Sequence, residues 1–395
     1  MTVCSSETIR LTEERFARLR AIEWWDQEKV RTARVLVIGA GALGNEVIKN
    51  LALLGVGNIV VVDMDRIEAS NLSRSVLFRE KDEGAFKASC AVRAAREIYS
   101  GINARAIDGN LLADVGLGWF RWAQVVVGAL DNREARVFVN SSCARVGRAW
   151  IDGGIDVLSG IVRGFAPPQT ACYECTMSKV DWDLLNKRRS CSLLARRAIA
   201  QRGTPTTPTA ASIIGACQVQ EVMKIIHGME ALLGRGFVFE GLGHNSYSTG
   251  YQKNPDCPWH DEPAEIQSLE LTSESTIGEL WREGEKRLAD RHAEACPTGL
   301  DAIDLAREIV QRLECPSCGR KQTVLRAAEK LSEDQIKCDG CGSECSPVFL
   351  HSITKESGLM ERKIGEIGLP EFEIVWARRG EKIMGLEISG DNRHG

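Results

Sequence analysis

Short apolar runs rich in valine and isoleucine recur along the first part of the chain, and segments with a helical repeat separate them. The runs occupy residues 34–38, 59–62, 104–107, 123–130 and 149–151. The clearest helical segments between them span residues 87–99 and 133–146. Strands that alternate with helices predict a sheet of mostly parallel strands with helices on both faces. The fold class expected for this part is therefore α/β.

The polarity pattern changes several times in the rest of the chain. Residues 10–30 predict a helix before the first strand, and residues 155–166 predict antiparallel strands. From 179 to 208 the chain is polar and basic, which is typical of a mobile loop that crosses the surface around a short helix. A strong helical pattern over 210–227 then leads to predicted strands over 236–252.

A change of composition at Pro263 divides the chain into two predicted domains. Residues 1–262 form the α/β domain, which includes the crossing loop over 179–208. Residues 263–395 are interpreted as a smaller α+β domain with a cysteine-rich insertion at about 315–345. A chain of 395 residues is long enough for two such domains.

Composition and charge exclude several classes of function. The formal net charge of −4 argues against a general nucleic-acid-binding protein. No apolar stretch approaches the roughly 20 residues that span a bilayer, so no membrane segment is expected. Residues 1–20 lack the apolar core of a signal peptide, and we expect a cytoplasmic protein.

A glycine-rich turn joins the first two predicted strands. Gly39, Gly41 and Gly44 follow the first strand, and Asp63 ends the second one, 19 residues after Gly44. Glycines in such a turn let the backbone approach phosphate oxygens, which sit at the N-terminus of the following helix. A carboxylate at the tip of the second strand accepts hydrogen bonds from ribose hydroxyls. This unit predicts a nucleotide site but does not indicate which nucleotide it binds.

Charged and amide side chains follow the predicted strands at the same edge of the sheet. Cations neutralise phosphate oxygens and a carboxylate holds Mg²⁺, so this set favours a nucleoside triphosphate over a nicotinamide cofactor. The candidate residues are Asp65, Asn71, Arg74, Lys87, Asp131 and Asn132. The alternatives are that Arg74 and Lys87 are surface charges, and that Asp131 only caps the following helix.

The spacing of the cysteines favours metal binding over disulfides, although fourteen are many for a protein expected in the cytoplasm. Three pairs have the spacing C-x-x-C and a fourth has C-x-x-H: Cys172/Cys175, Cys315/Cys318, Cys338/Cys341 and Cys257/His260. Nineteen residues separate the pair Cys315/Cys318 from the pair Cys338/Cys341, which is the spacing of a zinc ribbon. Cys345 is a spare or alternative ligand of that site.

Cys191 is the candidate nucleophile. It has no paired cysteine, lies in the crossing loop, and follows three cations at 187–189. Nearby cations stabilise a thiolate, and the dipole of a helix that starts at Cys191 would add to this effect. The alternative is an inert loop cysteine. Three other cysteines fall on predicted helices and are expected to be structural: Cys90, Cys143 and Cys217.

In combination, these motifs resemble the adenylation domain shared by ubiquitin-activating enzymes and the molybdopterin- and thiamine-pathway adenylyltransferases. The similarity covers about residues 10–260, which is roughly two thirds of the chain. The similar segments are RFAR at 15–18, GAGALG at 39–44, VVDMD at 61–65, NLSRSVLF at 71–78, GAFKA at 84–88, ALDNREAR at 129–136, CYEC at 172–175 and ASIIGACQVQEVMKIIHG at 211–228. The resemblance implies that a carboxylate attacks the α-phosphate of ATP and that pyrophosphate leaves. In this family the carboxylate is the C-terminal glycine of a ubiquitin-like protein.

The resemblance also assigns roles to the residues of the nucleotide site. It implies that the three turn glycines line the phosphates, that Asp63 binds ribose and that Asp131 binds Mg²⁺. The residues implied to contact the triphosphate are Asn71, Arg74 and Lys87. Arg18 matches an arginine that reaches the ATP of the other subunit, which implies a homodimer. The alternative for Arg18 is a solvated residue on a helix.

Two further expectations come from the same resemblance. The family closes a structural zinc between two ligand pairs, which implies a site made by Cys172, Cys175, Cys257 and His260. His260 departs from the usual cysteine, but Zn²⁺ accepts three cysteines and one histidine equally well. The position of Cys191 matches the loop that carries the family's thioester.

The C-terminal region resembles the ubiquitin-fold domain of activating enzymes more loosely. Residues 269–289 resemble its opening strand and helix, and the end of the chain resembles its last strands. This resemblance implies that residues 263–395 recruit a conjugating enzyme, and the alternative is a stabilising appendage. The leading hypothesis is an activating enzyme for a ubiquitin-like protein. The alternatives are a sulfur-carrier adenylyltransferase of cofactor biosynthesis and a non-catalytic dimer partner or scaffold.

Overall fold

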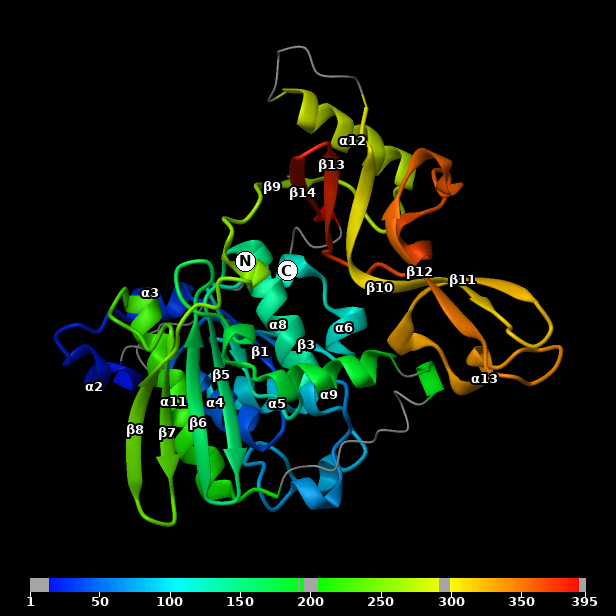
Figure 1. Ribbon diagram of the computed structural model, residues 1–395. Coiled ribbons are helices and arrows are strands. Elements are labelled where there is room, and N and C mark those ends of the chain that lie inside the picture. The colour runs from blue at the N-terminus through cyan, green and yellow to red at the C-terminus, as the bar shows by residue number, and fades with distance from the viewer. Residues whose placement is uncertain (1–13, 191, 195–204, 291–298, 391–395) are drawn as a thin grey trace.

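The protein is described by a computed structural model that covers residues 14–190, 192–194, 205–290 and 299–390 (Figure 1). Two β-sheets organise these residues. The first sheet lies at the core of the N-terminal part, and the second belongs to residues 266–388. The prediction of a mostly parallel α/β core with a second, smaller α+β unit is therefore confirmed.

The first sheet has eight strands. They are β1 (Arg34–Ile38), β2 (Asn58–Val62), β3 (Asn103–Ile107), β4 (Val125–Gly128), β5 (Trp150–Asp156), β6 (Ser159–Phe165), β7 (Arg235–Glu240) and β8 (Asn245–Gly250). Their order in space is β3-β2-β1-β4-β5-β6-β7-β8. The strands β3, β2, β1, β4 and β5 run parallel, and β6, β7 and β8 continue the sheet as antiparallel neighbours.

Helices cover both faces of this sheet. They are α2 (Ala17–Arg20), α3 (Gln27–Thr32), α4 (Ala42–Leu54), α5 (Lys87–Ile98), α6 (Leu111–Asp114), α7 (Leu117–Trp122), α8 (Arg133–Val146), α9 (Lys179–Ser190) and α11 (Pro208–His227). The helices α4, α5 and α11 pack on the face that carries Val35 and Val37. The helices α7, α8 and α9 pack on the face that carries Leu36 and Ile38. Because both faces are covered, the central strands are continuous apolar runs.

Two of the sequence predictions about the N-terminal part are wrong in detail. The single helix predicted over 10–30 is, within the described residues, two short helices. The second one starts because the carboxylate of Asp26 accepts the N–H groups of Glu28 and Lys29 at 3.0 and 3.2 Å, which is a helix N-cap. The predicted crossing loop begins with the 12-residue helix α9, since Leu185 is buried against the sheet.

The second sheet has six strands and one long covering helix. Its elements are β9 (Ile266–Leu269), α12 (Ile277–Asp290), β10 (Ala302–Glu314), β11 (Lys321–Ala327), α13 (Glu333–Ile336), β12 (Ser346–Ile353), β13 (Ile374–Arg379) and β14 (Lys382–Ile388). The order is β11-β10-β13-β14-β9, and β12 pairs with β10. The apolar face of α12, with Leu280 and Trp281, packs on this sheet.

Short 3-10 turns connect many of these elements. They are η1 (Ala69–Asn71), η2 (Glu80–Asp82), η3 (Glu174–Thr176), η4 (Pro258–His260), η5 (Ala328–Lys330), η6 (Lys355–Ser357) and η7 (Ile364–Ile367).

A buried ion pair of the C-terminal unit connects this unit to the N-terminal part through its hydrogen bonds. Arg307 on β10 pairs with Glu373, and both side chains are almost fully buried. The Arg307 guanidinium also donates to the carbonyls of Leu112 and Val115, at 2.8 and 3.1 Å. Glu373 accepts the N–H of Leu117 at 3.2 Å. These bonds fix the second sheet to the segment that contains α6 and α7.

The backbones of the two units also approach very closely here. The N–H of Gly118 donates to the carbonyl of Phe372 at 2.8 Å. A Cβ atom added at Gly116 would lie 2.3 Å from that carbonyl oxygen. Only glycine fits at such a distance, so this contact requires glycine at position 116. The predicted domain boundary at 262/263 stays a prediction.

Candidate functional site: a nucleotide-binding edge and two cysteine clusters

The three glycines of the first turn have different roles. Gly39 has φ +98°, and a Cβ on it would lie 2.3 Å from the Ala129 carbonyl oxygen. A Cβ on Gly44 would lie 2.0 Å from the Gly39 carbonyl oxygen. Around Gly41, in contrast, no described atom lies within 4 Å of an added Cβ. Gly39 and Gly44 therefore allow close packing, and Gly41 leaves open space at the N-terminus of the 13-residue helix α4.

Asp63 is tied to this turn. One of its carboxylate oxygens accepts the N–H of Ala40 at 2.7 Å, and the other accepts the N–H of Asp65 at 2.8 Å. Burial raises the pKa of the Asp63 carboxyl, and these two hydrogen bonds oppose that rise. Asp63 thus fixes the distance between the ends of β1 and β2, and its role toward ribose stays a prediction.

The predicted cations differ in their surroundings. The Lys87 ammonium lies 2.8 Å from a carboxylate oxygen of Asp65, and the lysine side chain is only 12% exposed. Arg74 is half-buried, and no described carboxylate lies within ion-pairing distance of it. Asn71 is buried and accepts the N–H of Glu68 at 3.1 Å. Arg74 is therefore the cation of this set that no described carboxylate neutralises.

Sequence reasoning missed Asn45, which is fully buried next to Gly44. Its amide nitrogen donates to the carbonyls of Ala40 and Gly41, at 2.7 and 3.0 Å. Its amide oxygen accepts the N–H of Leu77 at 2.8 Å. Asn45 thus joins the glycine turn to the segment that carries Arg74. Because Glu46 beside it is also polar, no local pattern in the sequence singled out Asn45.

Asp131 and Asn132 have different positions at the start of α8. The side chain of Asn132 caps α8 by accepting the N–H of Ala135 at 2.8 Å. Its amide also donates to Asp131 at 3.1 Å. The alternative that Asp131 caps this helix is therefore wrong. Asp131 is exposed at the carboxyl end of β4, beside β1, and its role as a Mg²⁺ ligand stays a prediction.

A second network that the sequence did not indicate supports the first half of β5. Asp152 is fully buried and pairs with both Arg136 and Arg163. Arg136 also donates to the carbonyls of Leu130 and Gly153, at 2.6 and 3.0 Å. Two cations around one buried carboxylate stabilise its charge and hold the loop that follows β4.

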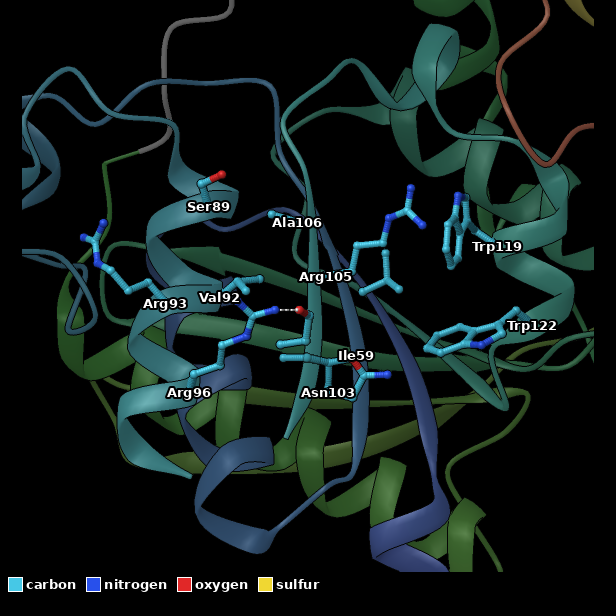
Figure 2. A pocket seen from close by; sticks show the side chains of 12 residues that line it. Ile59, Ser89, Val92, Arg93, Arg96, Asn103, Arg105, Ala106, Trp119 and Trp122 are labelled. Carbon is cyan, nitrogen blue, oxygen red and sulfur yellow. Dashed lines mark hydrogen bonds between the residues drawn. The ribbon is translucent and has the colours of Figure 1, made fainter. Parts of the chain in front are cut away.

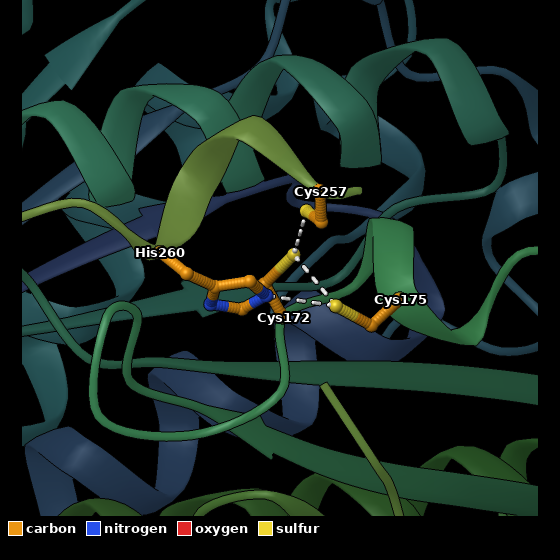
Figure 3. Close-up of side chains that lie close together, drawn as sticks. All are labelled: Cys172, Cys175, Cys257 and His260. Carbon is orange, nitrogen blue, oxygen red and sulfur yellow. Dashed lines mark hydrogen bonds between the residues drawn. The ribbon is translucent and has the colours of Figure 1, made fainter. Parts of the chain in front are cut away.

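The first predicted zinc site is assembled in the structure (Figure 3). The ligand atoms of Cys172, Cys175, Cys257 and His260 all lie within 4.8 Å of one another. Cys172 Sγ lies 3.7 Å from Cys175 Sγ and 3.5 Å from Cys257 Sγ, and Cys175 Sγ lies 3.0 Å from His260 Nε2. Tetrahedral Zn²⁺ with bonds of about 2.3 Å separates its sulfur ligands by about 3.8 Å. The geometry therefore fits a structural metal ion.

The second cluster lies in the C-terminal unit. Cys315, Cys318, Cys338 and Cys341 also have their sulfur atoms within 4.8 Å of one another. Hydrogen bonds from Ser343 lower the pKa of Cys341 to about 6, and the N–H of Gly340 lowers that of Cys338. The Cys341 thiol is thus favoured in the thiolate form that binds metal. Cys345 is buried and not part of this four-ligand group, and its burial raises its pKa to about 11.

The remaining predicted residues are placed as follows. Arg18 is exposed on α2, and its role toward a second subunit stays a prediction. Cys191 lies outside the described residues. Cys90 and Cys143 are buried and Cys217 is half-buried, which agrees with structural roles. Burial raises the pKa of both Cys143 and Cys217, so these thiols are poor nucleophiles.

A cavity of about 380 Å³ lies at the outer edge of β3, away from the glycine turn (Figure 2). Arg93, Arg96 and Trp119 are among the residues that line it. Arg96 donates to the carbonyl of Ala104 at 2.5 Å and so covers part of the open strand edge. None of the predicted nucleotide residues lines this cavity.

The fold and the site define an α/β nucleotide-binding protein, with its glycine turn at the first strand and carboxylates at the ends of the neighbouring strands. The model of the ThiF family matches residues 14–259, which is more than half of the chain. The chain belongs to the ThiF family.

Similar proteins carry names of activating enzymes and adenylyltransferases. A sulfur carrier protein adenylyltransferase of Thermus thermophilus is 30% identical over 62% of this chain and 88% of its own length. A ubiquitin-activating enzyme E1-like protein of Saccharomyces cerevisiae is 34% identical over 38% of this chain. The match spans only 24% of that yeast protein.

Solved structures agree with the fold. A crystal structure of E. coli MccB with ATP has a TM-score of 0.51 at 23% identity, and the match covers 62% of this chain and 73% of that one. Within the described ranges, no helix has the length and apolar character needed to cross a membrane.

Proposed function

We propose that this protein activates a ubiquitin-like protein at the expense of ATP. It adenylates the C-terminal glycine of that protein, forms a thioester on Cys191 and passes the acyl group to a conjugating enzyme. The observation that carries the proposal is the open N-terminus of α4 at Gly41, beside the Ala40 N–H that the Asp63 carboxylate accepts. Membership of the ThiF family and the names of its relatives support the same reaction class.

The residues at this edge fit a bound ATP molecule. The free N–H groups at the start of α4 receive phosphate oxygens beside Gly41. Arg74 and Lys87 neutralise the triphosphate, and Asp63 receives ribose hydroxyls. Asp131 would hold Mg²⁺, which supplies further charge neutralisation when bound. The site positions the reactants and needs no strong base, because the attacking carboxylate is already ionised.

The second step transfers the acyl group to sulfur. The Cys191 sulfur forms a bond to the carbonyl carbon of the glycine, the bond from that carbon to the phosphate oxygen breaks, and AMP leaves with the electron pair. The thiol proton passes to solvent. The sequence supplies cations at 187–189 directly before Cys191. Positive charge nearby favours the thiolate that attacks.

We propose two further partners, a conjugating enzyme and a second copy of this chain. The family match ends at residue 259, so the six-stranded sheet over 266–388 is an addition to it. We assign to this sheet the recruitment of a conjugating enzyme. Arg18, exposed on α2, is assigned to the ATP site of the other subunit of a homodimer. We place the protein in the cytoplasm, with one structural Zn²⁺ in each cysteine cluster.

The main alternative is a sulfur-carrier adenylyltransferase, and the relative from Thermus thermophilus favours it, since the match spans 88% of that protein. Both functions include adenylation, and they differ in what the adenylate becomes. The deciding experiment incubates the protein with Mg-ATP and either ubiquitin or a sulfur carrier protein as the probe. Pyrophosphate exchange followed by a thiol-sensitive covalent complex supports the activating enzyme, and exchange without a complex supports the alternative. A scaffold gives neither product.

A further inference from the structure

The outer edge of β3 is open, and the cavity of about 380 Å³ lies along it (Figure 2). The strand β3 stands first in the order of the sheet, so β2 is its one neighbouring strand in the described part of the chain. The N–H of Asn103 donates to the Gly57 carbonyl at 2.7 Å, which turns the odd-numbered positions of β3 toward β2. Because alternate residues of a parallel strand bond to a given neighbour, the backbone groups of Ala104 and Ala106 point to the open edge.

Two helices form the walls of this cavity, which we call the β3 groove. Arg93 and Arg96 extend from α5 on one side of β3 (Figure 2). Trp119 and Trp122 belong to α7 and lie on the other side. Arg105 on β3 points toward this second wall, where its guanidinium carbon lies 4.7 Å from the centre of the Trp119 ring. The groove therefore has one basic wall and one aromatic wall.

The charge of the β3 groove is positive. Among the described residues that line it, three are arginines and none is acidic. Arg93 already pairs with the buried Asp82, which neutralises part of its charge. Arg105 lies 3.8 Å from a carboxylate oxygen of Glu371, and both side chains stay partly exposed, at 43% and 60%. A guanidinium has five N–H groups, and Arg96 donates to the backbone of β3 at 2.5 Å, which holds its charge at the open edge. The groove thus favours a ligand that carries carboxylates.

We propose that the β3 groove binds an extended acidic segment of another protein, which pairs with β3 as an additional strand. The N–H groups of Ala104 and Ala106 and the Ala106 carbonyl supply the backbone pairing. Side chains alternate between the two faces of a strand, so those toward α5 meet the basic wall and those toward α7 meet the aromatic wall. The recognised segment therefore alternates acidic residues with aliphatic or aromatic ones. The five residues of β3 span about 16 Å, which accommodates about five residues of the partner.

This binding site is separate from the nucleotide edge. None of the residues assigned to ATP lines the β3 groove, so changes in the groove should leave ATP–pyrophosphate exchange unchanged. The inference therefore does not depend on the proposed function. A free anion would use only the arginines, whereas an extended segment also uses the open strand edge and the aromatic wall, and this difference decides the design of the test.

The first test measures affinity with a fluorescein-labelled peptide of alternating glutamate and leucine, by fluorescence anisotropy of the intact protein. The double variant Arg96→Gln/Arg105→Gln should weaken binding by about tenfold, as expected for the loss of two partly exposed ion pairs. The matched control is Arg282→Gln/Lys286→Gln, which removes two exposed cations of α12 outside the groove and should bind like the wild type. A peptide with lysine in place of glutamate should bind the wild type at least about tenfold more weakly.

The second test changes only the peptide, so it does not depend on how well a variant folds. Two versions carry N-methyl groups either on every glutamate or on every leucine. Alternate N–H groups of a strand face the same neighbour, so one version should lose binding and the other should keep it. Amide hydrogen exchange at Ala104 and Ala106 should slow when the unmodified peptide binds.

Four results would overturn the inference. They are no binding of the acidic peptide, equal binding of the acidic and the lysine peptides, unchanged affinity in the double variant, and unchanged binding by both N-methylated versions. The last result, together with a loss of affinity in the double variant, would make the groove a site for anions alone. Unchanged hydrogen exchange at Ala106 in the complex would likewise exclude pairing with β3.

Discussion

Lys87 is held twice by Asp65. Its ammonium lies 2.8 Å from the Asp65 carboxylate, and its backbone N–H donates to the Asp65 carbonyl at 2.9 Å. Asp65 follows β2 by three residues, and Lys87 is the first residue of α5. The pair therefore fixes the start of α5 against the end of β2 and keeps a cation at the nucleotide edge. Asp65 is thus the partner of Lys87, and its own role toward the nucleotide stays a prediction.

The two residues should differ in their effect on adenylation. Lys87→Gln removes the charge that the proposed function places against the triphosphate, and a charged hydrogen bond contributes about 1.5–3 kcal/mol. ATP–pyrophosphate exchange should fall by about 10- to 100-fold, which is that energy converted at 1.4 kcal/mol per factor of ten. Asp65→Asn should reduce exchange less, since it only frees the lysine. Lys29→Gln, a change at an exposed lysine on α3, is the control and should leave exchange unchanged.

Asp131 and Asn132 offer a paired test of catalysis against stability. Asp131→Ala should abolish exchange and leave the free energy of unfolding unchanged, because the residue is exposed and caps nothing. Asn132→Ala should cost about 1 kcal/mol of stability, since it removes the cap of α8. Exchange assays and urea unfolding of the two variants check both statements. Full exchange activity in Asp131→Ala would defeat its assignment to Mg²⁺.

A change of Arg307 alone should lower the free energy of unfolding strongly, and a change of both Arg307 and Glu373 should lower it less. Arg307→Met leaves Glu373 charged and buried without its partner, which typically costs about 3–5 kcal/mol. Adding Glu373→Gln removes that charge and should recover much of the loss. Urea unfolding of the single and double variants measures this coupling. The exposed pair Lys363 and Glu274 is the control, and its Lys363→Ala variant should change stability by less than about 1 kcal/mol.

The two cysteine clusters predict two zinc ions per chain. Elemental analysis of the purified protein should count about two, and His260→Ala and Cys318→Ser should each lower the count by one. Neither variant changes a residue of the nucleotide edge. The remaining ATP–pyrophosphate exchange activity should therefore be proportional to the fraction of the protein that is folded. Loss of both ions in either single variant would contradict two independent sites.

Local sequence patterns were sufficient to predict most strands of the first sheet. The β-branched run at 34–38 and the helix at 133–146 appear at the predicted residues, because each depends on short-range repeats and on a cap such as Asn132. The long helix predicted over 10–30 failed because Asp26 starts a new helix within it. The helix α9 was predicted as loop because its stability comes from Leu185 against a distant sheet.

The residues of the candidate site also fall into those that a local sequence pattern revealed and those that it did not. The glycines, the acids and the cysteine pairs were visible as motifs, and the structure brings the two sets of four metal ligands together. Asn45, Asp152 and the burial of Leu193 in one apolar cluster with Leu313 and Leu331 were not visible. Each of them acts between segments that lie far apart in sequence, and no local pattern reports such contacts.

The account depends most on a covalent intermediate at Cys191. The direct measurement incubates wild-type and Cys191→Ala protein with Mg-ATP and ubiquitin or a sulfur carrier protein, and analyses the products by non-reducing gel and mass spectrometry. The account predicts a thiol-sensitive complex that maps to Cys191 in the wild type, and in the variant no complex but full pyrophosphate exchange. A complex that persists in Cys191→Ala would contradict the assignment of the nucleophile. Exchange without a complex in the wild type would contradict the thioester step itself.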